Sequence, residues 1–594
     1  MLPSTTEKPP SADSDTHQVP ITTAMDDIQK MGEPRSSEDV SVFPETSTDI
    51  TEKLKDRYFS SVNYIGSLAA IGLAGMAGIG AFSLIAPVLS NINQDIGPDP
   101  NYVWISLSNN LTQAVMLTIV GRLSDLLGRR YCQIGGTALA LIGCIVGAAA
   151  TSINMLIGAN VLIGLGSSTQ VSFPYLIAEI VPIKNRYMAS IYIYALLIPV
   201  SGVSSIVATA LFNNTASTWR SSYFLIIAIN AAALACWVLF YHPPSWNDLS
   251  NATSDSSQKK TSMLQQIDFI GLFLLAAGLL LFLMGLSWGG SVFQWKSAGV
   301  ISTMAIGGLL LIAFVLFELR LDGPRSLVPM ELFSNFQWVA VVGTLSMAAS
   351  MYYAFNIVFP RQVDVLYSNV SPDRQGWLKC LIGGPPLLGQ IVACLFATKI
   401  GRIKYQLVVA SAVGAAFYGA NACVTTTNMT TIVVLLCIGG FALGWVDALA
   451  LVSLSVTLKN QRMIGTGVGV ASALRTVIST SSATVYTAIL NNRLGTTIPG
   501  TMTGALVQAG LPSSSVPSFI ATIQTNPSQL TNIPGVSSRI ISIGMEAFKS
   551  ANAKAYTTVY LSTIAFSAVG VIFSLLTPKI ESKLTDSITT RLKV

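Results

Sequence analysis

The sequence predicts an all-α polytopic membrane protein, and three observations support that prediction. The chain has 594 residues, of which 51% are hydrophobic and only 10% are charged. Fourteen apolar segments are each long enough to cross about 30 Å of hydrocarbon as a helix. The charged residues gather in the short stretches between these segments. Such a chain must bury itself in lipid, where a helix satisfies every backbone hydrogen bond internally.

Residues 1–60 precede the first apolar segment, and we expect them to form a disordered cytoplasmic tail. They are rich in Ser, Thr, Asp, Glu, Lys and Pro and have no apolar face. They therefore cannot bury enough apolar surface to offset the conformational entropy that the chain would lose on folding. They also lack the short apolar run of a cleavable signal peptide, so the first helix itself is expected to start membrane insertion.

The predicted spans alternate with short loops whose charge sets the topology. The spans cover residues 65–90, 102–121, 131–150, 153–177, 187–212, 219–241, 266–288, 298–318, 337–359, 378–398, 405–424, 432–456, 463–490 and 556–577. Fourteen Lys and Arg residues lie in the loops on one side, against four on the other. This excess places the first side, and both termini, in the cytoplasm. The stretch 491–555 is then an extracellular loop, and its apolar patches around Leu506 and Phe519 predict that it packs over the extracellular mouth.

A charged run joins the second and third spans. It reads Gly121-Arg122-Leu123-Ser124-Asp125-Leu126-Leu127-Gly128-Arg129-Arg130. Its glycines let helix ends approach closely, and Asp125 can pair with arginines or cap a neighbouring helix. The run resembles the loop after the second helix of major facilitator transporters, G-x-L-a-D-r-x-G-r-r. The resemblance implies a cytoplasmic gate made of Gly121, Arg122, Asp125, Gly128, Arg129 and Arg130, although an ordinary positive-inside loop is the simpler alternative.

The chain also repeats itself at long range. Ala81-Phe82-x4-Pro87 recurs 273 residues later as Ala354-Phe355-x4-Pro360, and the same offset matches Trp104 with Trp377 and Gly128-Arg129 with Gly401-Arg402. Thr398 stands where the first copy has Asp125, so the predicted gate is asymmetric. Two halves related by an axis along the membrane normal are typical of major facilitators.

The repeat predicts the domain organisation of a major facilitator fold. Helices 1–6 match helices 9–14, which leaves two inserted helices between two six-helix halves. The expected parts are the N-terminal half 61–243, the cytoplasmic linker with inserted helices 244–336, the C-terminal half 337–577 including loop 491–555, and the cytoplasmic tail 578–594.

Two charged residues fall inside predicted spans. Asp447 lies well inside the twelfth span, and Arg475 lies near the middle of the thirteenth. A charge at a helix centre costs about 2.5–3.5 kcal/mol on insertion scales, so it suggests function by default. We interpret Asp447 and Arg475 as a coupling element that exchanges partners or a proton. A permanent structural ion pair is an equally weighted alternative.

Uncharged polar residues inside the spans suggest the lining of a substrate cavity, although each such residue alone is more often a helix–helix hydrogen bond than a substrate contact. They are Asn109, Gln113, Asn160, Gln170, Tyr194 and Gln390, with Asn110 and Tyr192 beside them. Gln170 is the strongest single candidate because it lies among small residues. The fifth span carries Ile198-Pro199-Val200-Ser201-Gly202, which retains the Pro-x-x-Gly of export-type members but is also sufficient for a simple kink.

The fourteen-span form, with Asp95-Ile96-Gly97, the Trp104 segment, Gly121–Arg130 and Gly439-Gly440, resembles a fungal drug-efflux branch of the major facilitators. Within this branch the sequence is most similar to the trichothecene efflux pump family, over roughly residues 60–580. The resemblance implies a plasma-membrane exporter of a fungal secondary metabolite, toxin or xenobiotic, driven by proton antiport. One departure matters: Asn160 stands where proton-coupled drug exporters often carry arginine, so Asp447 and Arg475 are the available replacements.

Other functions have less support. Import of a ferric siderophore fits the same architecture, and a non-transporting nutrient sensor is a weaker alternative. No nucleophile–base set, metal motif or phosphate-binding loop occurs, so we expect no enzyme activity, cofactor, metal site or nucleic-acid partner. The expected partners are a small organic substrate, protons and the lipid bilayer, with the chain acting as a monomer. A vacuolar or vesicle membrane is an alternative location.

Sequons at Asn213, Asn369 and Asn428 fall in predicted outer loops and are the expected glycosylation sites, whereas Asn251 falls inside.

Overall fold

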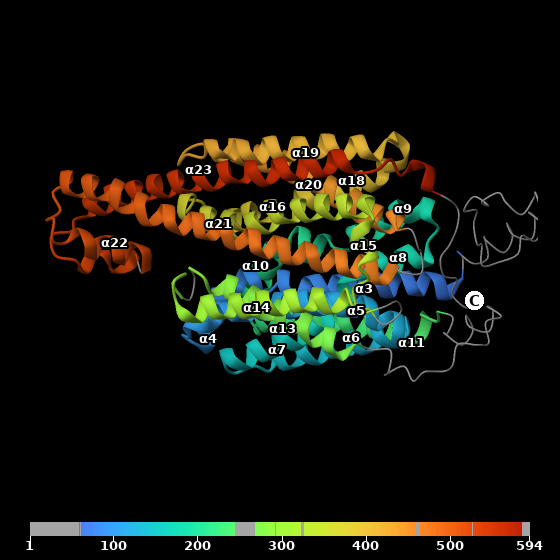
Figure 1. The fold of residues 1–594 in the computed structure, drawn as a ribbon. Helices are drawn as coiled ribbons and strands as arrows, with labels where there is room; N and C mark the ends of the chain where they lie inside the picture. Colours follow the sequence, from blue (N-terminus) through green and yellow to red (C-terminus); the bar gives the residue numbers. More distant parts are fainter. Residues whose placement is uncertain are drawn as a thin grey trace, which may run out of the picture. The chain divides into compact units, whose positions relative to one another are not determined.

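The computed structural model describes residue 59 and residues 61–243, 268–290, 293–321, 326–458, 464–525 and 527–584. Within these ranges the chain is almost entirely helical and contains no β-strand, as Figure 1 shows. The all-α prediction is therefore confirmed. The predicted tail up to residue 58, the sequon at Asn251 and the last ten residues lie outside the described part of the chain.

The N-terminal six predicted spans all fall on helices. These are α3 (Val62–Ser83), α4 (Leu89–Ile96), α5 (Trp104–Leu127), α6 (Arg129–Ala148), α7 (Ile153–Val171), α8 (Phe173–Ile180), α9 (Arg186–Leu196), α10 (Ser204–Asn214) and α11 (Arg220–Phe240). Serine side chains cap the first turns of two of these helices: Ser61 accepts from the Tyr64 backbone N–H at 3.2 Å, and Ser152 from that of Met155 at 3.3 Å. Such caps satisfy backbone donors that the helix itself leaves free.

The remaining predicted spans also coincide with helices. The inserted pair is α13 (Phe269–Trp288) and α14 (Ala298–Glu318). After the short α15 (Glu331–Ser334), the C-terminal part comprises α16 (Phe336–Leu366), α17 (Pro372–Lys379), α18 (Gly384–Ile400), α19 (Ile403–Ala420), α20 (Met429–Thr457), α21 (Ile464–Gln508), α22 (Val516–Thr525) and α23 (Ser538–Leu576).

Ten of the described helices are long and apolar enough to cross a membrane, and the bent pair Asp373–Ile382 and Gly384–Ile400 makes an eleventh. The other three predicted spans coincide with α5, with α9 and α10, and with α21. These helices carry more polar residues or are interrupted. By length and composition alone they therefore look less suited to crossing a membrane. The arrangement is consistent with fourteen spans.

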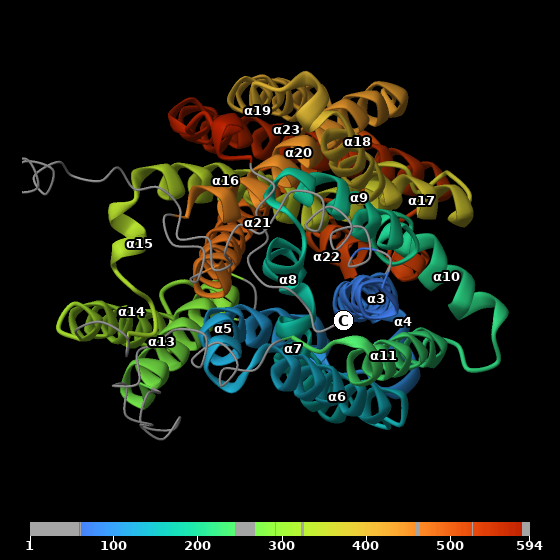
Figure 2. The ribbon, with the colours of Figure 1, turned by 90° about the vertical axis from the view of Figure 1, so that its right-hand side faces the viewer.

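The inserted pair packs beside the second and thirteenth predicted spans. Helices α13 and α14 pack against each other, and α13 also contacts α5 and α21, as Figure 2 shows. Leu283 of α13 is fully buried against Leu111 and Ala114 of α5. The rings of Trp104 and Trp288 meet edge to face with centroids 5.9 Å apart. The insertion thus covers one side of the contact between α5 and α21.

The stretch 491–555 differs from its prediction as a loop. Helix α21 continues to Gln508, α22 follows, and α23 already begins at Ser538. At about 1.5 Å per residue, the 45 residues of α21 extend about 68 Å, more than twice the hydrocarbon thickness. Figure 1 shows both long helices continuing past the other helices, with α22 beside them.

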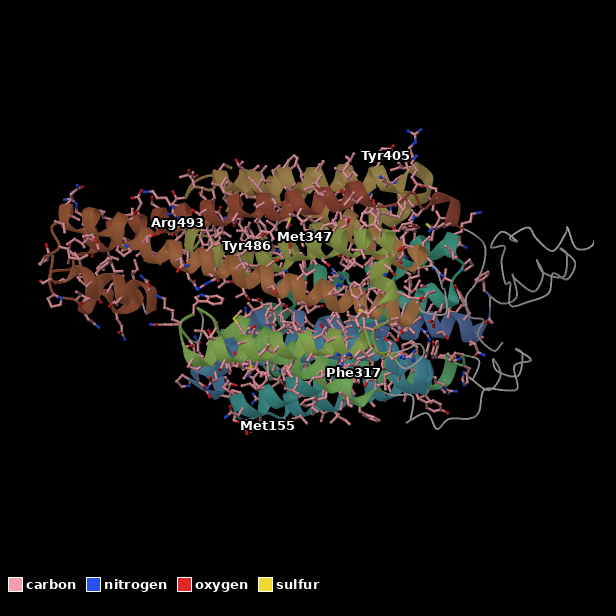
Figure 3. All side chains as sticks on the ribbon, in the orientation of Figure 1. Met155, Phe317, Met347, Tyr405, Tyr486 and Arg493 are labelled. Atoms are coloured by element: carbon pink, nitrogen blue, oxygen red, sulfur yellow. The ribbon has the colours of Figure 1, made fainter. Side chains whose placement is uncertain are left out.

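The apolar residues of this helical extension form a core of their own. Leu506 and Phe519 are fully buried and cluster with residues such as Met502, Leu530 and Ile540. Their partners come from the extension itself, so they do not serve to pack a loop over an outer mouth. Arg493, labelled in Figure 3, joins the two long helices through an Nε–Oγ1 hydrogen bond of 3.1 Å to Thr558.

Candidate functional site

Three helices of the C-terminal half meet at an intramembrane ion pair. Arg475 of α21 donates from Nη2 to Oδ1 of Asp447 on α20 at 2.6 Å. Gln390 of α18 donates from Nε2 to the other carboxylate oxygen, Oδ2, at 2.8 Å. Two predicted coupling residues and one predicted cavity residue are therefore brought together, with both carboxylate oxygens occupied.

The environment of this pair makes its charges consequential. The Asp447 side chain is 11% exposed and that of Arg475 is 27% exposed. Removing one partner of such a pair leaves the other charge buried without compensation, which is strongly destabilising. The geometry fits both interpretations of the pair, a permanent ion pair and a switch.

Helix α9 of the N-terminal half brings Tyr194 toward the same pair. Tyr194 is buried and lies within electrostatic range of both Asp447 and Arg475. Among the described residues, neither the Tyr194 hydroxyl nor Nε of Arg475 has a hydrogen-bond partner. Two unpaired donors from opposite halves thus lie near the carboxylate.

Directly after α9 the chain makes a π-helical turn, Ile198–Gly202. Pro199 has no N–H and cannot continue the α-helical pattern, and Val203 instead donates to Ile198 O at 3.0 Å. The start of α18 packs against this turn, where the backbone of Gly383 approaches Ser201 so closely that a side chain would not fit. The predicted kink is confirmed, and it positions the fifth span against α18. Single π-turns inside helices are frequent at functional sites.

The predicted cavity residues of the N-terminal half hydrogen-bond to their neighbours. Asn160 donates from Nδ2 to the Tyr223 hydroxyl at 3.2 Å and accepts from Asn109 Nδ2 at 3.4 Å. Gln113 donates to Ser167 Oγ at 2.9 Å. In this conformation these side chains act as helix–helix contacts.

Gln170, the strongest cavity candidate, is almost fully buried. Its Nε2 donates to Asn230 Oδ1 at 2.6 Å, which links α7 to α11. Its Oε1 has no hydrogen-bond partner among the described residues. Asn109 Oδ1 is likewise buried without a partner among the described residues. An unsatisfied buried acceptor is costly, so Gln170 and Asn109 both have binding capacity to spare.

The gate region brings the two halves into backbone contact. A Cβ added to Gly121 of α5 would lie 2.6 Å from the carbonyl oxygen of Gly465 on α21, and one on Gly469 would lie 3.3 Å from Gly121 Cα. Only glycine allows two helices this close. Gly121 therefore lies on the interface between the two halves, and its role in a gate stays a prediction.

Two of the predicted gate arginines, Arg129 and Arg130, have partners within the N-terminal half. Arg129 forms an ion pair with Glu179 of α8, and its guanidinium lies over the Tyr175 ring, 5.0 Å from the centroid. Arg130 donates to the Val238 carbonyl at 2.8 Å. The side chain of Asp125 lies outside the described residues, so its predicted pairing stays a prediction.

Gly128 has a φ of 90°, and its repeat partner Gly401 has a φ of 60°, so both copies of the motif turn the chain at a left-handed glycine.

Sequence reasoning missed three residues of this region: Glu179, Arg186 and Tyr187. Arg186, almost fully buried, donates from Nη1 to Ser455 Oγ of α20 at 2.9 Å. The hydroxyls of Tyr187 and Ser453 lie 3.3 Å apart. Both contacts join the halves. Glu179 could have been found from the sequence as the acid that ends an apolar run, seven residues before Arg186.

The predicted glycosylation sites differ in accessibility. Asn213 is exposed near the end of α10. Asn369 is also exposed, and its Oδ1 accepts from Lys549 Nζ at 3.1 Å. Asn428 is half-buried, and its Nδ2, the atom that would carry a glycan, donates to the Cys423 carbonyl at 2.7 Å.

Long apolar helices, a backbone contact between halves at one end and an ion pair within the bundle together define a multi-pass membrane transporter of the major facilitator fold. The fold is similar to that of the human organic anion transporter MFSD10 (TETRAN), with a TM-score of 0.51, 12% sequence identity and coverage of 86% of this chain and 100% of that chain. At this identity the likeness shows the fold alone.

A family model described as fungal trichothecene efflux pump matches residues 35–593, so the chain belongs to that family. It is 26% identical over 541 residues to the trichothecene efflux pump TRI12 of Fusarium sporotrichioides, covering 90% of this chain and 89% of the relative. It is also 26% identical over 553 residues to the pump of the same name from Trichoderma arundinaceum, covering 90% of both. The chain is thus an exporter of small molecules, and the expectation that it is not an enzyme is confirmed.

Proposed function

We propose that this exporter moves a moderately large, mainly apolar fungal metabolite or toxin out of the cell in exchange for protons. Its family and the names of its relatives support a substrate of the trichothecene kind. The observation that carries the proton-coupling part is the three-helix contact of Asp447 with Arg475 and Gln390.

Asp447 is suited to carry the proton because of where it lies. Three acids are buried among the described residues: Glu179, Glu318 and Asp447. The first two lie at or next to the ends of their helices, whereas Asp447 lies inside α20. In the proposed cycle, a proton from outside neutralises the carboxylate and weakens its bond to Arg475. Release of that proton to the cytoplasm restores the ion pair.

Arg475 then takes the role that other proton-coupled exporters give to an arginine on the fourth span. In this chain Asn160 occupies that position and is held by Asn109 and Tyr223. When Arg475 is released from Asp447, the nearby hydroxyl of Tyr194 is an available polar partner from the opposite half. An exchange of this kind would link protonation to the relative position of the two halves.

The described conformation supports alternating access. The end of the helix bundle that carries Gly121 and Arg129, here called the gate end, is closed in it. The contact of Gly121 with Gly465 and the hydrogen bond of Arg186 to Ser455 would have to separate for that end to open. We assign this end, both termini and Arg129 to the cytoplasm because of the excess of Lys and Arg in its loops. Residues 61–243 and 337–577 are the proposed halves.

We further propose that the chain is a monomer in the plasma membrane, glycosylated on its outer side. Asn213 is the favoured acceptor because it is exposed, whereas Asn369 and Asn428 hydrogen-bond to neighbouring groups. A glycan on Asn213 would support the proposed orientation. A glycan on Asn251 would overturn it.

Transport by the purified full-length protein in proteoliposomes tests the function. The probe is a radiolabelled trichothecene, with an imposed pH gradient as the only driving force. We expect uphill accumulation in the compartment from which protons leave, and loss of accumulation when an ionophore collapses the gradient. Exchange of labelled for unlabelled probe without any response to the gradient would retain the exporter and contradict proton coupling.

A further inference from the structure

A basic hollow lies where α19 begins and where the chain leaves α23. It has a volume of about 490 Å³ and is lined by Arg402, Lys404, Tyr405, Lys579 and Glu581. Three cations and one carboxylate give it an excess of positive charge. Neither the transport site nor the proposed gate uses any of these five residues.

The single carboxylate of the hollow already has a structural role. Oε1 of Glu581 accepts from the Ile403 backbone N–H at 2.6 Å, so it caps α19 and holds the segment after α23 in place. Within the described part of the chain, Arg402, Lys404 and Lys579 form no ion pair with it or with any other acid. Their charge is therefore available to an anion.

The surroundings of the hollow are those of a lipid-facing surface. Val409 follows Tyr405 by four residues on α19, and Ile572 and Leu575 lie on the last turns of α23. Each of these three apolar side chains is about half exposed or more. Residues four apart share a helix face, so the exposed side of α19 changes from a tyrosine at its start to aliphatic surface one turn later. Figure 3 shows Tyr405 at the outer margin of the helices, near the start of α19.

We propose that this hollow binds the phosphate-bearing headgroup of an anionic phospholipid. Arg and Lys side chains donate to phosphate oxygens, and tyrosine favours the level of the headgroups at a membrane surface. The acyl chains would lie along the aliphatic surface that Val409, Ile572 and Leu575 provide. A soluble phosphate compound could use the same cations but would gain nothing from that surface. The combination therefore favours a lipid.

Lipid binding to the full-length, delipidated protein tests the proposal. The probe is dioleoyl phosphatidic acid, measured by native mass spectrometry in detergent, with dioleoyl phosphatidylcholine and glycerol phosphate as comparison ligands. The variants are Lys579→Gln, the double variant Arg402→Gln/Lys579→Gln, and Glu581→Gln. Lys583→Gln is the matched control, because Lys583 lies on the same segment but bonds to Gln337 and does not line the hollow.

Each cation near an anionic headgroup contributes about fivefold to affinity. We expect Lys579→Gln to lower affinity for phosphatidic acid about fivefold and the double variant roughly 25-fold, with Lys583→Gln unchanged. Glu581→Gln keeps an acceptor for Ile403 but removes the negative charge, so it should raise affinity about fivefold. A gain of this sign is not expected from general damage to the fold.

Two outcomes would overturn the proposal. Equal affinities in the parent, Lys579→Gln and Glu581→Gln would show that the lipid binds elsewhere. Glycerol phosphate binding as tightly as phosphatidic acid would show a site for soluble anions and would refute the lipid assignment. Because Lys579→Gln alters one exposed side chain, the test remains decisive even if the double variant is poorly expressed.

Discussion

Replacing Gly121 with alanine should push the transporter out of the conformation in which the gate end is closed. The added Cβ would lie 2.6 Å from the carbonyl oxygen of Gly465, about 0.8 Å short of an ordinary contact of 3.4 Å. Both atoms belong to, or are fixed by, backbone in packed helices. Neither can move aside without shifting α5 away from α21.

Overpacking of this kind costs about 1–3 kcal/mol, and here the cost falls only on the closed conformation. The gain in helix propensity from glycine to alanine applies to both conformations and cancels. The equilibrium should therefore shift about 5- to 150-fold toward the open gate. We expect transport to slow while the amount of protein in the membrane stays normal.

The shift can be measured as labelling of a cysteine introduced at Val452. This residue is buried on α20 beside Arg186 and Ser455. A membrane-impermeant maleimide applied from the cytoplasmic side should label Val452→Cys faster when Gly121→Ala is also present. Gly135→Ala is the matched control, because a Cβ there would meet nothing within 4 Å. Unchanged labelling and unchanged transport in Gly121→Ala would refute the proposal that this contact closes the gate.

Two further predictions concern the ion pair of Arg129 with Glu179 and the helical extension of residues 491–555. Glu179→Gln should weaken the interaction with Arg129 and slow transport roughly 5- to 30-fold, while substrate affinity in a binding assay stays near that of the parent. A large loss of affinity would contradict a role confined to the gate. Phe519→Ala should destabilise the extension by about 3–5 kcal/mol and make residues 491–555 sensitive to protease, with the exposed Phe333→Ala as control; unchanged protease resistance would contradict an independent core in the extension.

The sequence predicts the helices of this protein well because lipid imposes a simple rule on them. Apolar runs of membrane length coincide with helices, and even the bend near Pro199 is readable from a residue that lacks an N–H. The extension 491–555 escaped this rule. Its helices lie outside the predicted spans and mix polar and apolar residues. No apolar run of membrane length therefore marks them as helical in the sequence.

The ion pair of the candidate site was predictable, whereas the contacts around it were less so. Asp447 and Arg475 are conspicuous because charge is rare in apolar segments, and the structure brings them together. The pairing of Arg129 with Glu179 depends on where the start of α6 and the end of α8 lie in the folded chain, which no spacing in the sequence reveals. The hydrogen bond of Arg186 to Ser455 likewise depends on the two halves meeting, 269 residues apart in sequence.

The response of Asp447→Asn to a pH gradient tests proton coupling most directly. Asparagine keeps the size of the side chain and an acceptor for Arg475, but it cannot take up and release a proton. In proteoliposomes we predict that this variant loses gradient-driven accumulation of a labelled trichothecene, while counterflow exchange of labelled for unlabelled substrate survives. If Asp447→Asn follows an imposed pH gradient as the parent does, then the ion pair with Arg475 is structural and the coupling site lies elsewhere.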